Sequence, residues 1–149
     1  AAEANYLAVM QLVQPGDHIV IETPGWPQAA VLGQAIGADI TRIRRSEADG
    51  WQLPLQALSD AVTSRTRLIF LTNPNNPTGA LMSADDLAQV VRIADRVGAW
   101  LLVDEAAVWS SRPAPRRKSR STRRARSRAA SSSAINSMSR RASASITAA

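Results

Sequence analysis

Hydrophobic and polar residues form two different patterns in residues 1–105. One is the short continuous apolar run, which is typical of a strand buried on both faces of a parallel sheet. Such runs occur at 19–21, 68–71 and 100–103. The other is the recurrence of apolar residues every three or four positions, which predicts helices. This spacing occurs at 2–13, 28–36, 54–62 and 83–97.

The order of these segments predicts an α/β fold. Residues 39–44 alternate apolar and polar side chains, as expected of a less buried, edge-like strand. Helices and strands alternate with short connections, which predicts a three-layer α/β/α arrangement around a mostly parallel sheet. Trp100 begins one of the apolar runs, so we expect it to pack in the core.

Two of the predicted helices have features that can be checked. The helix at 83–97 has a capping-box sequence, Ser83 with Asp86, and Gly98 is placed to end it. In the helix at 2–13, the residues near helical spacing, expected to form the apolar face, are Ala4, Leu7, Ala8, Leu12 and Val13.

Charge divides the chain into two parts. Residues 1–105 contain all 12 acidic residues and seven arginines, for a net charge of −5, whereas 106–149 contain ten arginines and Lys118, for +11. From residue 107 onward Arg, Ser and Ala dominate, and such a segment cannot bury enough apolar surface to offset its ordering entropy. We therefore expect a folded domain over 1–106 and a disordered, low-complexity tail over 107–149.

Two interpretations of this tail are open. Arg, Ser, Ala and Pro have GC-rich codons, as expected of a GC-rich gene read in the wrong frame, and the composition changes at one point. Alternatively, the tail is a basic arm that binds nucleic acid without sequence preference, through its arginines and the phosphates.

Cysteine and histidine usage excludes several classes of site. The chain has no cysteine and one histidine, so it has neither a disulfide framework nor a thiolate metal site, and we predict no metal. His18 begins a predicted strand, at the end opposite to the usual ligand site of α/β sheets, and we interpret it as structural. No apolar run approaches the ~20 residues that span a bilayer, and a signal-peptide pattern is absent, so a cytoplasmic protein is the default expectation.

Polar residues directly follow two of the predicted strands. Residues 73–79 are Asn-Pro-Asn-Asn-Pro-Thr-Gly, and their two prolines exclude both a helix and a central strand. Asp104 follows the apolar run at 100–103. Since open α/β sheets bind ligands at the carboxyl ends of their strands, these side chains predict a site there. Turn formation and helix capping are the structural alternatives.

These motifs resemble the large domain of class I and II aminotransferases, the fold type I pyridoxal phosphate enzymes. The resemblance rests on residues 73–79, on Leu-Leu-Val-Asp-Glu-Ala at 101–106 and on their order, and it covers about residues 1–106. It implies pyridoxal 5′-phosphate as cofactor, amino group transfer between an amino acid and a 2-oxo acid, and a homodimer. A complete aminotransferase is considerably longer, so we expect this chain to be a fragment.

The resemblance also implies which residues bind the cofactor. Asp104 matches the aspartate at the ring nitrogen, and Asn76 matches the asparagine that donates to the 3′ oxygen. Trp26 resembles the aromatic residue that stacks on the ring, with core packing as its structural alternative. Ala1 and Ala2 resemble the end of the phosphate-binding segment before a helix, although an ordinary alanine-rich helix start has the same sequence.

Two positions depart from the family. Ala107 stands where the family has a tyrosine that reaches the 3′ oxygen. Lys118 is the chain's one lysine and lies within a basic run with no apolar strand around it, which is unlike a Schiff-base lysine. We therefore identify no catalytic residue and predict that the chain as given is inactive.

Overall fold

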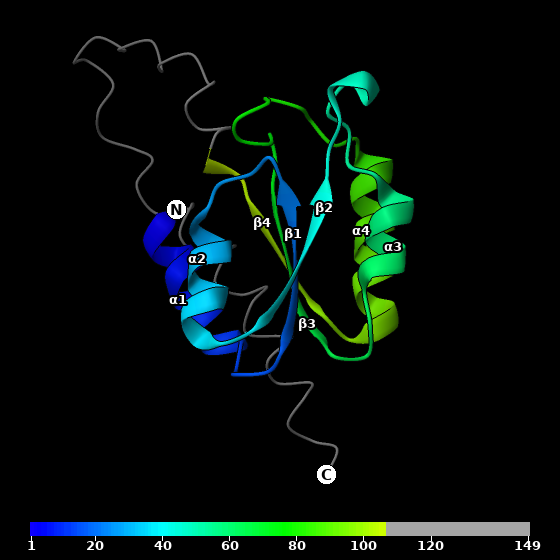
Figure 1. The fold of residues 1–149 in the computed structure, drawn as a ribbon. Coiled ribbons are helices and arrows are strands. Elements are labelled where there is room, and N and C mark those ends of the chain that lie inside the picture. The colour runs from blue at the N-terminus through cyan, green and yellow to red at the C-terminus, as the bar shows by residue number, and fades with distance from the viewer. Residues whose placement is uncertain (107–149) are drawn as a thin grey trace, which may run out of the picture. The chain divides into compact units, whose positions relative to one another are not determined.

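The structure, a computed structural model, describes residues 1–106. Figure 1 shows a parallel sheet between two pairs of helices, which confirms the predicted α/β fold. The elements are α1 (Ala2–Leu12), β1 (His18–Thr23), α2 (Gln28–Ile36), β2 (Asp39–Arg44), a 3₁₀ turn (Glu47–Asp49), α3 (Leu55–Ala61), β3 (Thr66–Thr72), α4 (Ala84–Val97) and β4 (Trp100–Asp104). The predicted tail lies outside the described residues.

The sheet has the strand order β2-β1-β3-β4, and every pairing is parallel. The central strands β1 and β3 carry the continuous apolar runs and are buried along most of their length. All four carboxyl ends therefore meet at one edge of the sheet, the upper edge in Figure 1. Thr72 at the end of β3 lies opposite Asp104 at the end of β4.

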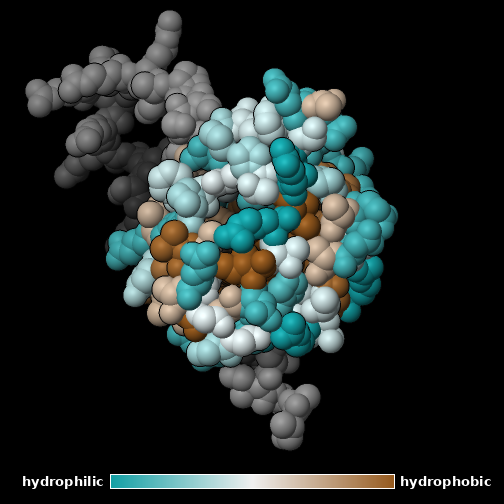
Figure 2. All heavy atoms as spheres, in the orientation of Figure 1, coloured by the Kyte–Doolittle hydropathy of each residue, from teal (hydrophilic) through white to brown (hydrophobic). Residues whose placement is uncertain are grey.

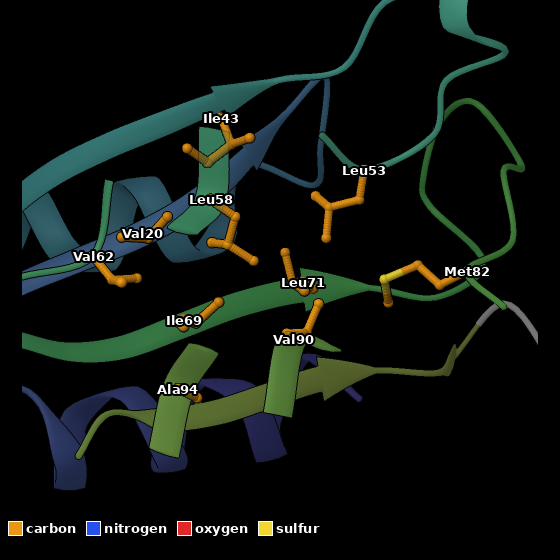
Figure 3. Packing of buried hydrophobic residues seen from close by; sticks show 10 residues of the cluster. All are labelled: Val20, Ile43, Leu53, Leu58, Val62, Ile69, Leu71, Met82, Val90 and Ala94. Carbon is orange, nitrogen blue, oxygen red and sulfur yellow. The ribbon is translucent and has the colours of Figure 1, made fainter. Parts of the chain in front are cut away.

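Each face of the sheet has its own hydrophobic core. Figure 3 shows the cluster under α3 and α4, in which Leu58 and Val90 pack against Val20 and Ile69 of the central strands. On the other face, Val9 of α1 packs with residues of α2, β1 and β3. The members of this second cluster are Val9, Val13, Ile19, Ile21, Ala29, Leu68 and Phe70.

The outer strands differ from their predictions in one respect. β2 is an edge strand, as its alternating sequence predicted. β4 is the other outer strand of the described sheet, and Trp100 is 50% exposed there. The prediction that Trp100 is a core residue is therefore wrong, because its strand has a neighbour on one side only. Figure 2 shows further apolar surface over α2 and beside β2, interrupted by hydrophilic side chains.

The structure confirms the predicted caps of α4 but not the predicted apolar face of α1. α4 begins with the Ser83–Asp86 capping box and ends at Gly98 in the left-handed conformation, φ 70°. In α1, however, the buried residues are Asn5 and Val9, whereas the predicted Ala4 and Leu7 are exposed. Eight of the eleven residues of α1 are apolar, so the pattern could not identify its inner face. Among the described helices, none has the length and apolar composition needed to cross a membrane.

His18 lies at the amino edge of the sheet, away from the carboxyl ends, as predicted. Its Nδ1 is 2.8 Å from the Thr66 hydroxyl and its Nε2 is 2.9 Å from the Thr41 hydroxyl. Burial lowers the pKa of His18, and the nearby charge of Arg65 lowers it further, while Asp39 opposes them. The folded protein therefore resists protonation of this ring.

We expect His18 to make the folded chain less stable in mild acid. Below the ordinary histidine pKa of about 6.5 the unfolded chain binds a proton that the folded chain resists, so the free energy of unfolding falls as the pH is lowered from about 7 to about 5. His18→Asn should flatten this dependence. Urea unfolding at a series of pH values measures it, and parallel pH curves for the two proteins would contradict the assignment.

Candidate functional site

The carboxyl edge of the sheet gathers the polar side chains that the sequence singled out. The loop at 73–79 continues from β3, and Asp104 ends β4 beside it. The Asn73 backbone N–H donates to the Asp104 carbonyl oxygen at 2.9 Å, so the parallel pairing continues into this loop. The strand ends therefore hold the loop and the carboxylate next to each other.

Asp104 has each carboxylate oxygen occupied by one donor. The Ala106 backbone N–H donates to Oδ1 at 2.8 Å. The Asn5 side-chain amide donates to Oδ2 at 2.7 Å from helix α1. The first contact is local, between residues two positions apart in the chain. The second joins β4 to the other end of the described chain and has no role in secondary structure.

Asn5 is buried, with 5% of its surface exposed. Its amide nitrogen also lies 3.5 Å from the side-chain oxygen of Gln28, at the start of α2. Gln28 in turn donates to the carbonyl oxygen of Ala2 at 2.7 Å. These contacts connect the first turn of α1 to the Asp104 carboxylate.

The 73–79 loop is held by Asn75 rather than by Asn76. Asn75 is 2% exposed, its amide donates to the Pro24 carbonyl oxygen at 3.2 Å, and its Oδ1 accepts from the Thr78 hydroxyl at 2.6 Å. The adjacent Asn76 side chain is exposed. Asn75 therefore ties this loop to the loop after β1, and Asn76 is left free to contact a ligand.

A buried ion pair lies beneath these loops. The Glu22 carboxylate accepts from Arg45 Nε at 2.8 Å and from Nη2 at 2.6 Å through Oε2, and from the Thr72 backbone N–H at 2.7 Å through Oε1. Arg45, 1% exposed, also donates to the Trp51 carbonyl oxygen at 2.6 Å. One carboxylate thus connects the ends of β1 and β3 with the segment after β2.

A groove of about 560 Å³ lies between the start of α1 and the end of β4. Its lining is formed by Ala1, Ala4, Asn5, Leu102, Val103, Asp104, Glu105 and Ala106. The structure therefore brings two of the predicted residues, Asp104 and Ala1, to one groove and adds Asn5. The other three predicted residues, Ala2, Trp26 and Asn76, do not line it.

Trp26 lies on the loop after β1, at the same edge of the sheet. It is 49% exposed, so it is not a core residue, and an open ring face is what stacking on a ligand requires. Gly25 precedes it where a Cβ atom would come within 2.7 Å of the Glu22 carbonyl oxygen. A glycine is therefore needed for the chain to turn from the buried Glu22 to the exposed tryptophan.

The groups at this edge have the chemistry that an anionic aromatic ligand requires. Ala1 caps α1 without a side-chain hydrogen bond, which leaves the first N–H groups of the helix available to a phosphate. Asp104 provides a carboxylate for a protonated ring nitrogen, and Asn76 an amide donor. Within residues 1–106 no cluster of three or more potential metal ligands is present.

Comparison with known proteins decides the family. The model of the family described as aminotransferase class I and II matches residues 1–107. The chain belongs to this family. The resemblance inferred from the two motifs is confirmed, and so is the fold, because structures of aminotransferases share it.

The names of the aminotransferase relatives give different substrates. An aspartate aminotransferase of Musicola paradisiaca is 30% identical over 105 residues, which cover 70% of this chain and 26% of the relative. A probable N-succinyldiaminopimelate aminotransferase of Mycobacterium tuberculosis is 35% identical over 106 residues, covering 70% and 27%. The chain thus spans about a quarter of the length of these relatives.

Among solved structures, a PLP-dependent aminotransferase from Streptococcus suis is 36% identical and superimposes with a TM-score of 0.68, covering 70% of this chain and 28% of that one. The N-succinyldiaminopimelate aminotransferase of Mycobacterium tuberculosis gives 33% identity and a TM-score of 0.66, covering 70% and 27%.

The sequence did not single out three residues that lie at the carboxyl edge of the sheet. Asn5 was hidden in an alanine-rich helix, and Glu22 and Arg45 are far apart in sequence. The available signal was charge: Glu22 ends an apolar strand, where an unpaired carboxylate would be costly to bury. A buried carboxylate of this kind requires a cationic partner, and Arg45 directly follows the neighbouring strand.

We expect Arg45→Met to destabilise the chain by about 3–5 kcal/mol, because Glu22 is left buried without its partner. Adding Glu22→Gln should recover part of the loss, since glutamine keeps an acceptor for the Thr72 N–H without a charge. Urea unfolding followed by circular dichroism measures both.

The matched control is Arg65→Met. Arg65 pairs with Asp39 at 3.2 Å on the surface, with the two side chains 68% and 61% exposed. Its loss should cost no more than about 1 kcal/mol. Equal losses for the Arg45 and Arg65 variants would show that the buried pair does not support the site edge.

Proposed function

We propose that residues 1–106 form the pyridoxal phosphate-binding part of an aminotransferase, which transfers an amino group between an amino acid and a 2-oxo acid. One observation carries the proposal: the Asp104 carboxylate, at the carboxyl end of β4, has a neutral amide and a backbone N–H as partners rather than a cation. Its negative charge is therefore available to a protonated ring nitrogen.

The residues at this edge fit the cofactor. Asp104 would hold the proton on the pyridine nitrogen, because a carboxylate beside it favours the charged ring. The exposed Asn76 amide would donate to the 3′ oxygen, and Trp26 would stack on the ring. Ala1 and Ala2, which have small side chains, would let a phosphate approach the first N–H groups of α1.

When bound, pyridoxal phosphate supplies an electron-withdrawing ring. The residues of this chain position that ring and keep its nitrogen protonated. Residues 1–106 contain no lysine, and Lys118 lies in the basic segment, so within the part of the chain that the structure describes no strand carries an amine that could bond the cofactor's aldehyde. We therefore propose non-covalent binding by this chain and no amino group transfer by it alone.

Two further properties are part of the proposal. The resemblance to aminotransferases implies a cytoplasmic enzyme that works as a homodimer, and the proposal includes both properties. Apolar side chains on the outer face of α1 favour a partner surface, because contiguous exposed apolar groups gain by burial. They are Tyr6, Leu7 and Met10, between 44% and 59% exposed.

We expect the full chain to bind pyridoxamine 5′-phosphate, which has no aldehyde and reports non-covalent binding alone. Asp104→Asn should weaken this binding roughly tenfold to a hundredfold, because a contact to a charged group is lost. Asp95→Asn is the control, an exposed aspartate near the end of α4. Fluorescence titration measures the Kd values.

Three results would count against the proposal. Absence of binding by the unsubstituted chain would remove the assigned cofactor, and equal weakening by both aspartate variants would remove Asp104 from the site. Amino group transfer by this chain alone would contradict the proposed inactivity.

A second candidate function concerns the basic segment. The net charge of +11 over residues 106–149 favours non-specific nucleic-acid binding by this part of the chain. Replacing the ten arginines after Glu105 with glutamine should then abolish binding to single-stranded DNA, and the unsubstituted chain should lose affinity steeply as salt is raised. Salt-independent binding, or binding that survives the replacement, would contradict this function.

A further inference from the structure

Asn5 is a buried polar side chain that packing does not explain. It occupies the inner face of α1, one turn before the fully buried Val9, where an aliphatic residue would pack against the sheet. A buried amide is costly unless it is hydrogen-bonded. Its short hydrogen bond, 2.7 Å long, goes to Asp104, 99 residues away along the chain.

We propose that Asn5 is a positioning residue, which orients the Asp104 carboxylate toward the ring nitrogen of the cofactor. This inference rests on the proposed function. Asn5 does not contact the ring in this assignment. It acts through Asp104, whose carboxylate it holds in one rotational state from the side of α1.

The geometry shows how the orientation is fixed. Asp104 accepts one hydrogen bond from Ala106 through Oδ1 and one from Asn5 through Oδ2, so rotation of the carboxylate would break both. Each oxygen keeps a second lone pair for a further donor. A protonated ring nitrogen can therefore bind without displacing either partner.

The chemistry of the partner also matters. An arginine or lysine in place of Asn5 would neutralise the carboxylate and compete with the ring nitrogen for it. An amide donates without adding charge. Asn5 therefore fixes the direction of the carboxylate and leaves its negative charge available to hold the ring proton.

Gln28 extends this arrangement to the other end of the groove. Its side-chain oxygen faces the Asn5 amide at 3.5 Å, and its amide donates to the Ala2 carbonyl oxygen at 2.7 Å. The start of α1, where a phosphate would bind, is thus connected through side chains to the carboxylate at the ring nitrogen. This gives the two ends of the ligand site a fixed separation.

A double-mutant cycle on the full chain tests the inference, with pyridoxamine 5′-phosphate as the probe. Asn5→Leu should raise the Kd about tenfold, because the carboxylate loses its orienting donor. In the Asp104→Asn background the same substitution should change the Kd by less than about twofold, since there is no carboxylate to orient. Gln11→Leu, an exposed change on α1, should leave the Kd unchanged.

A second variant separates positioning from a merely structural role. Asn5→Asp keeps the shape of the side chain but places two carboxylates next to each other. Binding should be weakened strongly at pH 8 and recover toward the unsubstituted value at pH 5, as the pair shares a proton. A structural defect would weaken binding equally at both pH values. Circular dichroism checks that each variant is folded.

The outcomes separate the two proposals. If the unsubstituted chain binds the probe but Asn5→Leu changes the Kd equally in both backgrounds, or not at all, the role of Asn5 is overturned and the proposed function stands. The same holds if the loss in Asn5→Asp does not depend on pH. If the unsubstituted chain does not bind the probe, the proposed function fails, and the role of Asn5 fails with it.

Discussion

The carboxyl edge of the sheet depends on the buried ion pair between Glu22 and Arg45. Its centre is the Glu22 carboxylate. It lies in a buried position between the ends of β1 and β3, and it accepts hydrogen bonds from Arg45 and from the Thr72 backbone. Hydrophobic burial fixes the middle of the strands, but it does not fix the direction in which the chain leaves them. The ion pair supplies that constraint, because a buried charge tolerates only an arrangement in which it is fully paired.

This arrangement also determines which charges remain for a ligand. Arg45 is paired with Glu22, also donates to the Trp51 carbonyl oxygen and is buried, so its charge is not available at the surface. Asp104, by contrast, has only neutral partners. The edge therefore offers the Asp104 carboxylate with only neutral partners, amide donors and a helix N-terminus, a combination that suits a cationic ring with an attached phosphate.

Much of the fold could be predicted from local patterns. The continuous apolar runs identified β1 and β3, and the capping box with Gly98 identified both ends of α4, because each of these signals lies within one element. The position of Asp104 beside the 73–79 loop followed from parallel topology alone. For the same reason the sequence could assign a candidate site to the carboxyl edge.

The rest depended on contacts between distant residues. Asn5 could not be recognised as buried, because α1 is apolar around most of its circumference and its partner is in the last strand. The difference between Asn75 and Asn76 is set by the path of the loop, since both have the same side chain. Trp100 was misassigned because an apolar run does not show whether its strand has one neighbour or two.

Backbone amide NMR of the full chain, titrated with pyridoxamine 5′-phosphate, tests the central claim most directly. The claim predicts that the amide resonances of residues 2–5, of the non-proline residues within 73–79 and of 104–106 shift together with one Kd, while His18 and Thr66 at the amino edge do not respond. Shifts confined to the amino edge, or to residues after 106, would contradict the assignment of the carboxyl edge as the cofactor site.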